Sequence, residues 1–422
     1  MSTATTTATA KPQPRKPARQ KLSLPVVLLI VAGALALISV VRLITGVDDI
    51  TSVGQVSGSL KLAIPIGLAG LGGLWAERAG VVNIGLEGMM ILGTWLGAWA
   101  GYQWGPWVGV LFGILGGALG GLLHAVITVT FGVNHIVSGV AINILAVGAT
   151  RYLSNFAFLK TSGSARKSPT IDPITEITVP GLSDAMKTLN GKHWFLISDL
   201  AGFLGGVVTE LSLLTVVALL LVPVTWWVLW RTAFGLRLRS CGESPVAAES
   251  LGVNVYRYKY LAVIISGGFA GLGGVFLAEV ASNFYQEGQT ANKGYIGLAA
   301  MIFGNWMPGG LAMGAGLFGY TDSLNLRASV TDGTNVHALL LFLVFVLALV
   351  ALWQLYRKKY VAGVIGAAVS ALLLVWYSLT DRVPSQFVTA APYIATLLVL
   401  ALSAQRLRAP KAVGLPYHKG GG

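Results

Sequence analysis

The sequence predicts an all-α, polytopic membrane helical bundle with about 10–12 transmembrane segments, an inverted internal repeat and one half-helix. Only 11% of the 422 residues are charged, against about a quarter in a soluble domain. Hydrophobic residues make up 55% and the mean hydropathy is +0.72. So few charges could not cover a water-soluble surface, which excludes a soluble enzyme, a nucleic-acid-binding module and a disordered chain.

Apolar runs between charge clusters divide the chain into roughly twelve segments, each compared with the ~20 residues that a spanning helix needs. They lie near residues 24–43, 58–75, 86–104, 107–131, 136–158, 211–230, 260–280, 295–304, 309–326, 336–356, 361–379 and 387–404. No small-residue cleavage site follows the first run, so we expect an uncleaved anchor rather than a signal peptide. The run at 295–304 is too short to span a membrane alone.

The basic residues predict the orientation of the chain. Residues 1–21 carry basic side chains without an apolar run, and we expect a disordered cytoplasmic tail. With the N-terminus inside, predicted cytoplasmic stretches hold 18 of the 29 lysines and arginines. The 231–259 loop and the 405–422 tail are then cytoplasmic, and the 159–210 loop is extracytoplasmic. The net charge of +13 therefore indicates topology and contact with anionic lipid, with no nucleic-acid partner.

Motifs for chemistry on the chain itself are missing from the sequence. The single cysteine, Cys241, permits no intrachain disulfide, and the five histidines have no metal-ligand spacing. No nucleophile–base or paired-carboxylate arrangement lies inside a predicted span. The phosphate-binding pattern G-x-x-x-x-G-K-[ST] is also missing, since the only Gly-Lys pair, Gly191-Lys192, is followed by His. We expect no enzyme activity, metal or cofactor on this chain.

An internal repeat divides the predicted membrane core at 22–330 and continues beyond it, with a first copy at about 58–158 and a second at about 260–356. Three matches occur in the same order: Ala69-Gly70-Leu71-Gly72-Gly73 with Ala270-Gly271-Leu272-Gly273-Gly274, Ile84-Gly85-Leu86 with Ile296-Gly297-Leu298, and Trp104-Gly105-Pro106 with Trp306-Met307-Pro308. The predicted topology runs the two copies in opposite directions, as is common in transporters. The segments at 361–404 would be additional.

Pairing the repeats makes the short run at 295–304 the partner of the segment at 86–104. A half-helix that enters the membrane and turns back is the natural interpretation, with 304–310 as its turn. Glycines at four-residue spacing, such as Gly113/Gly117/Gly121 and Gly267/Gly271, indicate close helix packing and identify no site.

Ionisable residues lie close to apolar spans in the stretch 77–90. Such residues are costly near lipid unless they are paired or face water, and they are therefore functional candidates. Glu77 and Arg78 can also be interpreted as a solvated interfacial turn. Glu87 lies at the start of a predicted span, where a carboxylate interacts favourably with the positive end of the helix. Helix capping, a structural role, is therefore the alternative to a functional role for Glu87.

The predicted cytoplasmic loop 231–259 contains the signature of a short helix. Ser244 and Pro245 are typical of a helix start, good helix formers follow, and Gly252 is typical of a stop. A two-turn helix between basic flanks at the membrane face is therefore predicted. Such a helix is either an inert connector or a docking element for another protein.

Two stretches carry a resemblance to a known family. Gly80–Met90 and Gly242–Val255, with Phe234-Gly235 before and Gly268–Gly274 after the second, resemble a permease subunit of bacterial ABC importers for branched-chain amino acids, ribose-type sugars and nucleosides. The Asn-Ile-Gly-Leu-Glu-Gly-Met-Met form is closer to the nucleoside and simple-sugar branch. The resemblance covers about residues 55–330. The long N-terminal tail and the segments after residue 360 depart from the family pattern.

The resemblance implies three protein partners in the cell membrane: a second permease subunit, a cytoplasmic ATPase that binds ATP and Mg²⁺, and an extracytoplasmic substrate-binding lipoprotein. The stretch that matches the family's coupling helix supplies Gly242, Glu243, Pro245, Val246, Ala247, Ala248 and Gly252. The resemblance implies that the chain itself translocates a small polar solute, a nucleoside or a simple sugar.

Polar and aromatic groups near the spans are candidates for the translocation path, because a nucleoside needs hydrogen-bond partners and an apolar slot for its base. They are Asn83, Glu87, Asn143, Phe303, Asn305 and Trp306. Each could equally be a packing or helix-bridging group. A solitary ion-coupled secondary transporter is the alternative function, since inverted repeats and a broken helix suit it as well.

Overall fold

The computed structural model describes residues 24–328, 333–384, 387, 390 and 407–420. The helices are α1 (Leu24–Thr45), α2 (Val53–Arg78), α3 (Leu86–Trp104), α4 (Pro106–Ala125), α5 (His135–Ala157), α6 (Leu159–Ser162), α7 (Leu182–Asn190), α8 (Ile197–Val208), α9 (Leu213–Arg231), α10 (Ala233–Glu243), α11 (Pro245–Ser250), α12 (Val255–Phe276), α13 (Lys293–Phe303), α14 (Pro308–Ala328), α15 (Thr334–Tyr356) and α16 (Tyr360–Leu379). A 3₁₀ turn lies at Asp48–Thr51, π turns extend α4 (Val126–Thr130) and α12 (Leu277–Ala281), and β1 (Glu176–Ile177) pairs antiparallel with β2 (Leu211–Ser212).

The predicted fold class, a helical membrane bundle, is confirmed. In the described part of the chain, seven helices are long and apolar enough to cross a membrane: α2, α4, α5, α9, α12, α15 and α16. The predicted segments at 24–43, 86–104 and 309–326 correspond to α1, α3 and α14, of 22, 19 and 21 residues. The predicted segment 387–404 lies almost entirely outside the described residues.

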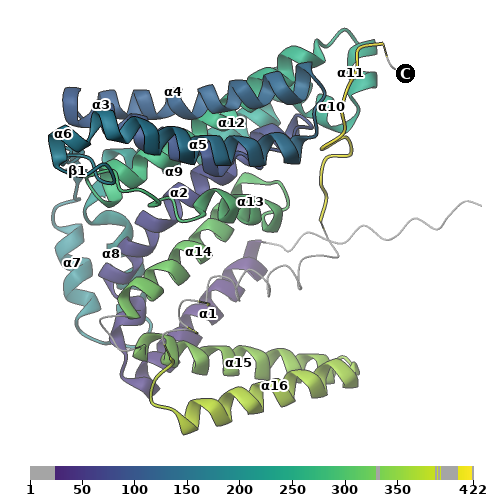
Figure 1. Ribbon diagram of the computed structural model, residues 1–422. Helices are drawn as coiled ribbons and strands as arrows, with labels where there is room; N and C mark the ends of the chain where they lie inside the picture. Colours follow the sequence, from purple (N-terminus) through teal and green to yellow (C-terminus); the bar gives the residue numbers. More distant parts are fainter. Residues whose placement is uncertain (1–23, 329–332, 385–386, 388–389, 391–406, 421–422) are drawn as a thin grey trace, which may run out of the picture.

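The core is built from a reciprocal arrangement of helices. α2 packs against α12, and each also packs against the helices that follow the other: α2 contacts α13 and α14, whereas α12 contacts α3 and α4 (Figure 1). This exchange is what two intertwined repeats with α2 equivalent to α12 would produce. The largely buried surfaces of α2 and α12 agree with their central position.

Small residues bring α4 and α12 into backbone contact. A Cβ added to Gly117 would lie 2.1 Å from the carbonyl oxygen of Gly267, and one added to Gly271 would lie 2.3 Å from that of Gly113. Both distances are far below van der Waals contact, so only glycine permits this crossing. The glycine spacing therefore marks helix packing, as the sequence predicts.

The two ends of the bundle carry different structures (Figure 1). α7, α8 and the β1–β2 pair lie at one end, called here the α8 end, and α10 and α11 lie at the other, the α11 end. The stretch 159–210, expected only as a loop, thus contains helices of its own. α15 and α16 form an antiparallel pair beside α1 at the periphery.

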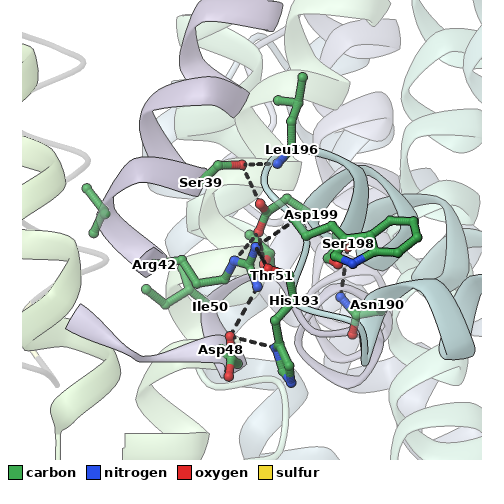
Figure 2. Close-up of polar contacts among 12 residues, drawn as sticks. Ser39, Arg42, Asp48, Ile50, Thr51, Asn190, His193, Leu196, Ser198 and Asp199 are labelled. Atoms are coloured by element: carbon green, nitrogen blue, oxygen red, sulfur yellow. Dashed lines mark hydrogen bonds and ion pairs between the residues drawn. The ribbon is translucent and has the colours of Figure 1, made fainter. Parts of the chain in front are cut away.

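A buried polar cluster joins α1 to the structure at the α8 end (Figure 2). Arg42, 3% exposed, lies with its Nε 3.0 Å from Oδ1 of Asp199, which is fully buried in α8. The other carboxylate oxygen of Asp199 accepts a hydrogen bond from Ser39, and Thr51 donates to Oδ1 at 2.5 Å. Because the buried charges are paired and hydrogen-bonded, this contact fixes the end of α1.

Candidate functional site

Helices α3 and α13 begin head to head inside the bundle, and Glu87 connects them. One carboxylate oxygen of Glu87 accepts a hydrogen bond from the backbone N–H of Asn292 at 3.1 Å, and the other accepts from that of Gly294 at 2.7 Å. Glu87 therefore caps α13, in the other repeat, as well as standing in the first turn of its own helix. A Cβ at Gly294 would lie 2.6 Å from the Glu87 nitrogen, so this approach requires glycine.

Asn143 of α5 completes the contact between the two helix starts. Its side-chain oxygen accepts a hydrogen bond from the Gly88 N–H at 2.7 Å. Its amide nitrogen donates to the carbonyl of Ile84 at 3.0 Å and to the hydroxyl of Tyr295 in α13 at 2.7 Å. Glu87, Asn143 and Tyr295 together are called the interior junction below.

Asn83 lies next to the interior junction but contacts a different helix. It is fully buried, and its amide nitrogen donates to the Ser266 hydroxyl of α12 at 2.9 Å. Three of the six residues predicted for a translocation path therefore lie on the short stretch before α3, in its first turn and on the facing side of α5. All three bridge backbone or side-chain groups of different elements.

The other three residues predicted for the path lie apart from the interior junction, toward the α11 end. Phe303 packs against Phe318 of α14, with ring centroids 5.7 Å apart. Asn305 and Trp306 form the turn between α13 and α14, at the position predicted for the turn of the half-helix. The structure thus brings the six residues together as two groups, one inside the bundle and one near its end.

Glu77 and Arg78 hold this turn. The Trp306 indole N–H donates to the Glu77 carboxylate at 2.5 Å, and Arg78 Nη2 donates to the Trp306 carbonyl at 2.6 Å. Glu77 is only 6% exposed, so a solvated interfacial turn is not what these residues form.

The predicted coupling helix is α11, and its start and stop follow the sequence pattern. Pro245 occupies the first turn, and Gly252 adopts φ +81° just beyond the C-cap residue Leu251. Glu243, Val246 and Ala247 are exposed, whereas Gly242 is buried. A Cβ at Gly242 would lie 2.3 Å from the Arg78 carbonyl oxygen, so only glycine fits there. The preceding helix α10 was not expected from the sequence.

Ala248 departs from the sequence expectation. The resemblance places Ala248 in the coupling stretch with Val246 and Ala247, but Ala248 is only 2% exposed. It packs with Cys241 and Val255 and against Tyr417 from the end of the chain. A residue two positions after Val246 points to the opposite side of a helix, so of these three residues only Val246 and Ala247 face solvent.

The last described segment, residues 407–420, lies along the α11 end and is called the C-terminal strap. Its backbone pairs with α10 and with the first repeat: the Ala412 N–H donates to the Gly242 carbonyl at 2.9 Å, and the Gly414 N–H donates to the Gly80 carbonyl at 3.2 Å. The Tyr417 hydroxyl donates to the Glu249 carboxylate of α11 at 2.5 Å. The strap therefore supports α11 from beneath.

Sequence reasoning missed several polar residues near the interior junction. Lys293, at the start of α13, forms an ion pair with Asp322 of α14 at 3.2 Å, with Lys293 buried and Asp322 half-buried. Asp322 could have indicated this ion pair, because it is a charged residue inside the predicted span 309–326. Tyr295 gave no such signal, because tyrosine is common at the ends of spans.

Comparison with known proteins decides the family. The model of the family described as "Branched-chain amino acid transport system / permease component" matches residues 55–349. The chain belongs to this family of membrane permeases. It is a multi-pass permease subunit, and its relatives are transporter subunits rather than enzymes.

Relatives of this permease align over most of its length. It is 34% identical to the guanosine ABC transporter permease protein NupQ of Bacillus subtilis over 86% of this chain and 96% of that protein. It is 33% identical to the nucleoside ABC transporter permease protein NupC of Lactococcus lactis, again over 86% and 96%. A putative glucose ABC transporter permease protein of Haloferax volcanii, TsgC13, is 30% identical over 87% and 98%. No solved structure matches the chain.

Proposed function

We propose that this permease is the transmembrane subunit of an ATP-driven importer that moves a nucleoside or a simple sugar across the cell membrane. The observation that carries the proposal is similarity over nearly the whole length of permeases named for guanosine and nucleoside transport. The polar interior junction, with its hydrogen-bonding amide, carboxylate and phenol groups, agrees with a neutral polar solute.

The proposed orientation places the α11 end and both chain termini in the cytoplasm, with the α8 end outside. Basic residues support it, since they gather at the α11 end: Arg231, Arg237, Arg239, Arg257, Lys259, Arg408, Lys411 and Lys419. Cytoplasmic edges of membrane proteins carry this excess of lysine and arginine. The same residues would contact anionic lipid.

Three protein partners follow from the proposal. A cytoplasmic ATPase, which would hold the ATP and Mg²⁺, docks on α11 through Val246 and Ala247, with Glu243, Pro245 and Gly252 shaping that helix. A second permease subunit, either a paralogue or a second copy, completes the membrane part. An extracytoplasmic binding lipoprotein delivers the solute to the α8 end.

The translocation path is proposed to pass the interior junction. Asn83, Glu87 and Asn143 would flank the path at mid-depth, and Phe303, Asn305 and Trp306 would lie near its cytoplasmic exit. The supporting observation is that the first three lie where two helices start inside the bundle, a position at which transporters commonly bind substrate.

A solitary ion-coupled carrier is the second candidate, and one observation favours it. Glu279, in the π turn after α12, is 1% exposed, and neither carboxylate oxygen has a hydrogen-bond partner in the described part of the chain. A buried carboxylate without a partner is suited to carrying a proton. The full-length similarity to ABC permeases outweighs this observation.

Purification from the native membrane tests the proposal. We expect an ATPase subunit to copurify with the tagged permease, and a strain without the transporter to lose uptake of radiolabelled guanosine or ribose. Leucine serves as the comparison solute, because the family also includes amino-acid permeases. Full uptake by the permease without any ATPase would instead identify a solitary carrier.

A further inference from the structure

A cavity of about 410 Å³ opens at the α8 end, between α3, α5 and the segment 282–292. Its deep wall carries hydroxyl groups of Thr94, Thr150 and Thr290, none more than 4% exposed. Its rim carries Arg151, Arg166 and Glu287. The volume falls within the range of small-molecule sites, about 300–1,000 Å³.

The wall of this cavity is held by backbone pairing. The Glu287 N–H donates to the Arg166 carbonyl at 2.9 Å, and the Ser168 N–H donates to the Tyr285 carbonyl at 3.0 Å. The Tyr285 N–H donates in turn to the Ser168 hydroxyl at 2.9 Å. Two segments that are far apart in sequence thus form one fixed wall, which favours a preformed site over a surface depression.

The cavity adjoins the interior junction directly. Ile91 lies one helical turn after Glu87 in α3, and Val147 lies one turn after Asn143 in α5, and both line the cavity. At its deep end, Thr290 is followed closely by Asn292, whose N–H Glu87 binds. A solute in the cavity would therefore stand immediately above the junction.

The rim of the cavity presents one carboxylate between two guanidinium groups. The Glu287 carboxylate pairs with Arg151 through one oxygen and with Arg166 at 3.6 Å through the other, so the guanidinium charges are partly balanced. Gln289 adds a buried amide nitrogen that has no hydrogen-bond partner in the described part of the chain. A carboxylate bound between two guanidinium groups offers acceptors and donors side by side, which matches two adjacent hydroxyls of a sugar ring.

We infer that this cavity is an extracytoplasmic vestibule in which the permease binds the sugar ring of its solute, with Glu287 accepting from a vicinal diol, before the solute passes the interior junction. This inference rests on the proposed function and specifies where the solute first contacts the chain. The hydroxyls on the deep wall serve as further hydrogen-bond partners, and Ile91 and Val147 provide apolar contact for the remainder of the solute.

Cysteine protection in intact cells tests occupancy of the vestibule. The Val147→Cys variant, made with Cys241→Ser in the otherwise native transport system, conserves volume and puts a thiol in the vestibule wall. A membrane-impermeant maleimide should label it, and millimolar guanosine should slow labelling at least about fivefold. Lys192→Cys, exposed at the same end and outside the cavity, is the control and should label at the same rate with or without guanosine. Equal labelling of Val147→Cys under both conditions would overturn the inference.

Uptake measurements test the role of Glu287. We expect Glu287→Gln to lower guanosine uptake about tenfold while membrane abundance and ATPase retention stay normal. The loss should be much smaller for 2′,3′-dideoxyguanosine, which has no diol. Glu176→Gln, an exposed glutamate in β1 at the same end, is the matched control. Normal guanosine uptake by Glu287→Gln would refute the vestibule alone, whereas a wild-type protein that takes up no nucleoside or sugar would refute the proposed function as well.

Discussion

At the interior junction, the Glu87 carboxylate accepts hydrogen bonds from two backbone N–H groups at the start of α13. A neutral amide of the same shape offers only one acceptor atom, so one of the two N–H groups loses its partner. A buried donor without a partner costs about 1–3 kcal/mol. The position is therefore sensitive to charge as well as to size.

We expect Glu87→Gln to reach the membrane in near-normal amount but to transport at least about tenfold more slowly. Glu87→Leu leaves both N–H groups without a partner, and its membrane abundance should fall too. Quantitative immunoblotting of membranes and guanosine uptake in vesicles separate the two effects. An equal loss of abundance in both variants would show that the carboxylate has only a structural role.

The reactivity of Cys241 reports on the packing between α11 and the C-terminal strap. It is fully buried, and this burial raises the pKa of its thiol to about 11. Since only the thiolate reacts, the reactive fraction at neutral pH is on the order of 100-fold smaller than for an exposed cysteine. Alkylation should be slow at pH 7 and accelerate as the pH rises toward 11.

Replacing Tyr417 with Ala uncovers this cluster, so Tyr417→Ala should speed alkylation of Cys241 at pH 7 at least about tenfold. The measurement is the rate of iodoacetamide modification by mass spectrometry, with denatured protein as the upper limit. Rapid alkylation of the unmodified native protein would contradict the packing of Tyr417 on Cys241.

At the scale of one element, the burial of each residue of α11, the proposed coupling helix, decides which substitution can test docking. Ala248→Arg would place a charge in the cluster under Tyr417 and disturb the chain itself, so it cannot test docking. Val246 is 48% exposed and lies on the free side of α11. A change there leaves the packing of the permease intact.

We expect Val246→Arg to insert normally but to retain less than about one tenth of the ATPase and to lose uptake. A charged side chain would be buried without a partner in the ATPase interface, which costs several kcal/mol. Pull-down of the ATPase with tagged permease measures this, and Arg257→Gln, a nearby exposed change, is the control. Normal ATPase retention by Val246→Arg would remove α11 from the docking surface.

For the whole molecule, the proposed orientation predicts opposite labelling of the two ends. In a Cys241→Ser background, Asp184→Cys in α7 should react with an impermeant maleimide in intact cells, because this residue is exposed at the α8 end. Arg237→Cys in α10 should react only after lysis. The reverse pattern would invert the topology and place α11 outside, where no ATPase could reach it.

Much of this architecture could be predicted because helix formation in lipid depends on local sequence. Each span must satisfy its own backbone hydrogen bonds, so the apolar runs located the long helices, and the proline and glycine around α11 located its ends. The partner of Glu87 could not be found in this way, since Gly294 lies 207 residues further along the chain. The burial of Ala248 likewise depends on Tyr417, and short helices such as α7 and α10 lack a long apolar run.

The C-terminal strap has a consequence for the order in which the permease matures. Residues 407–420 leave the ribosome after every described helix. Their contacts with Gly80, Gly242 and Glu249 nevertheless complete the packing beneath α11. A nascent chain can thus insert all of these helices while the Cys241–Ala248 cluster still lacks its Tyr417 cover. In the proposed orientation, the packing beneath the helix that would dock the ATPase is therefore complete only when synthesis has passed residue 417.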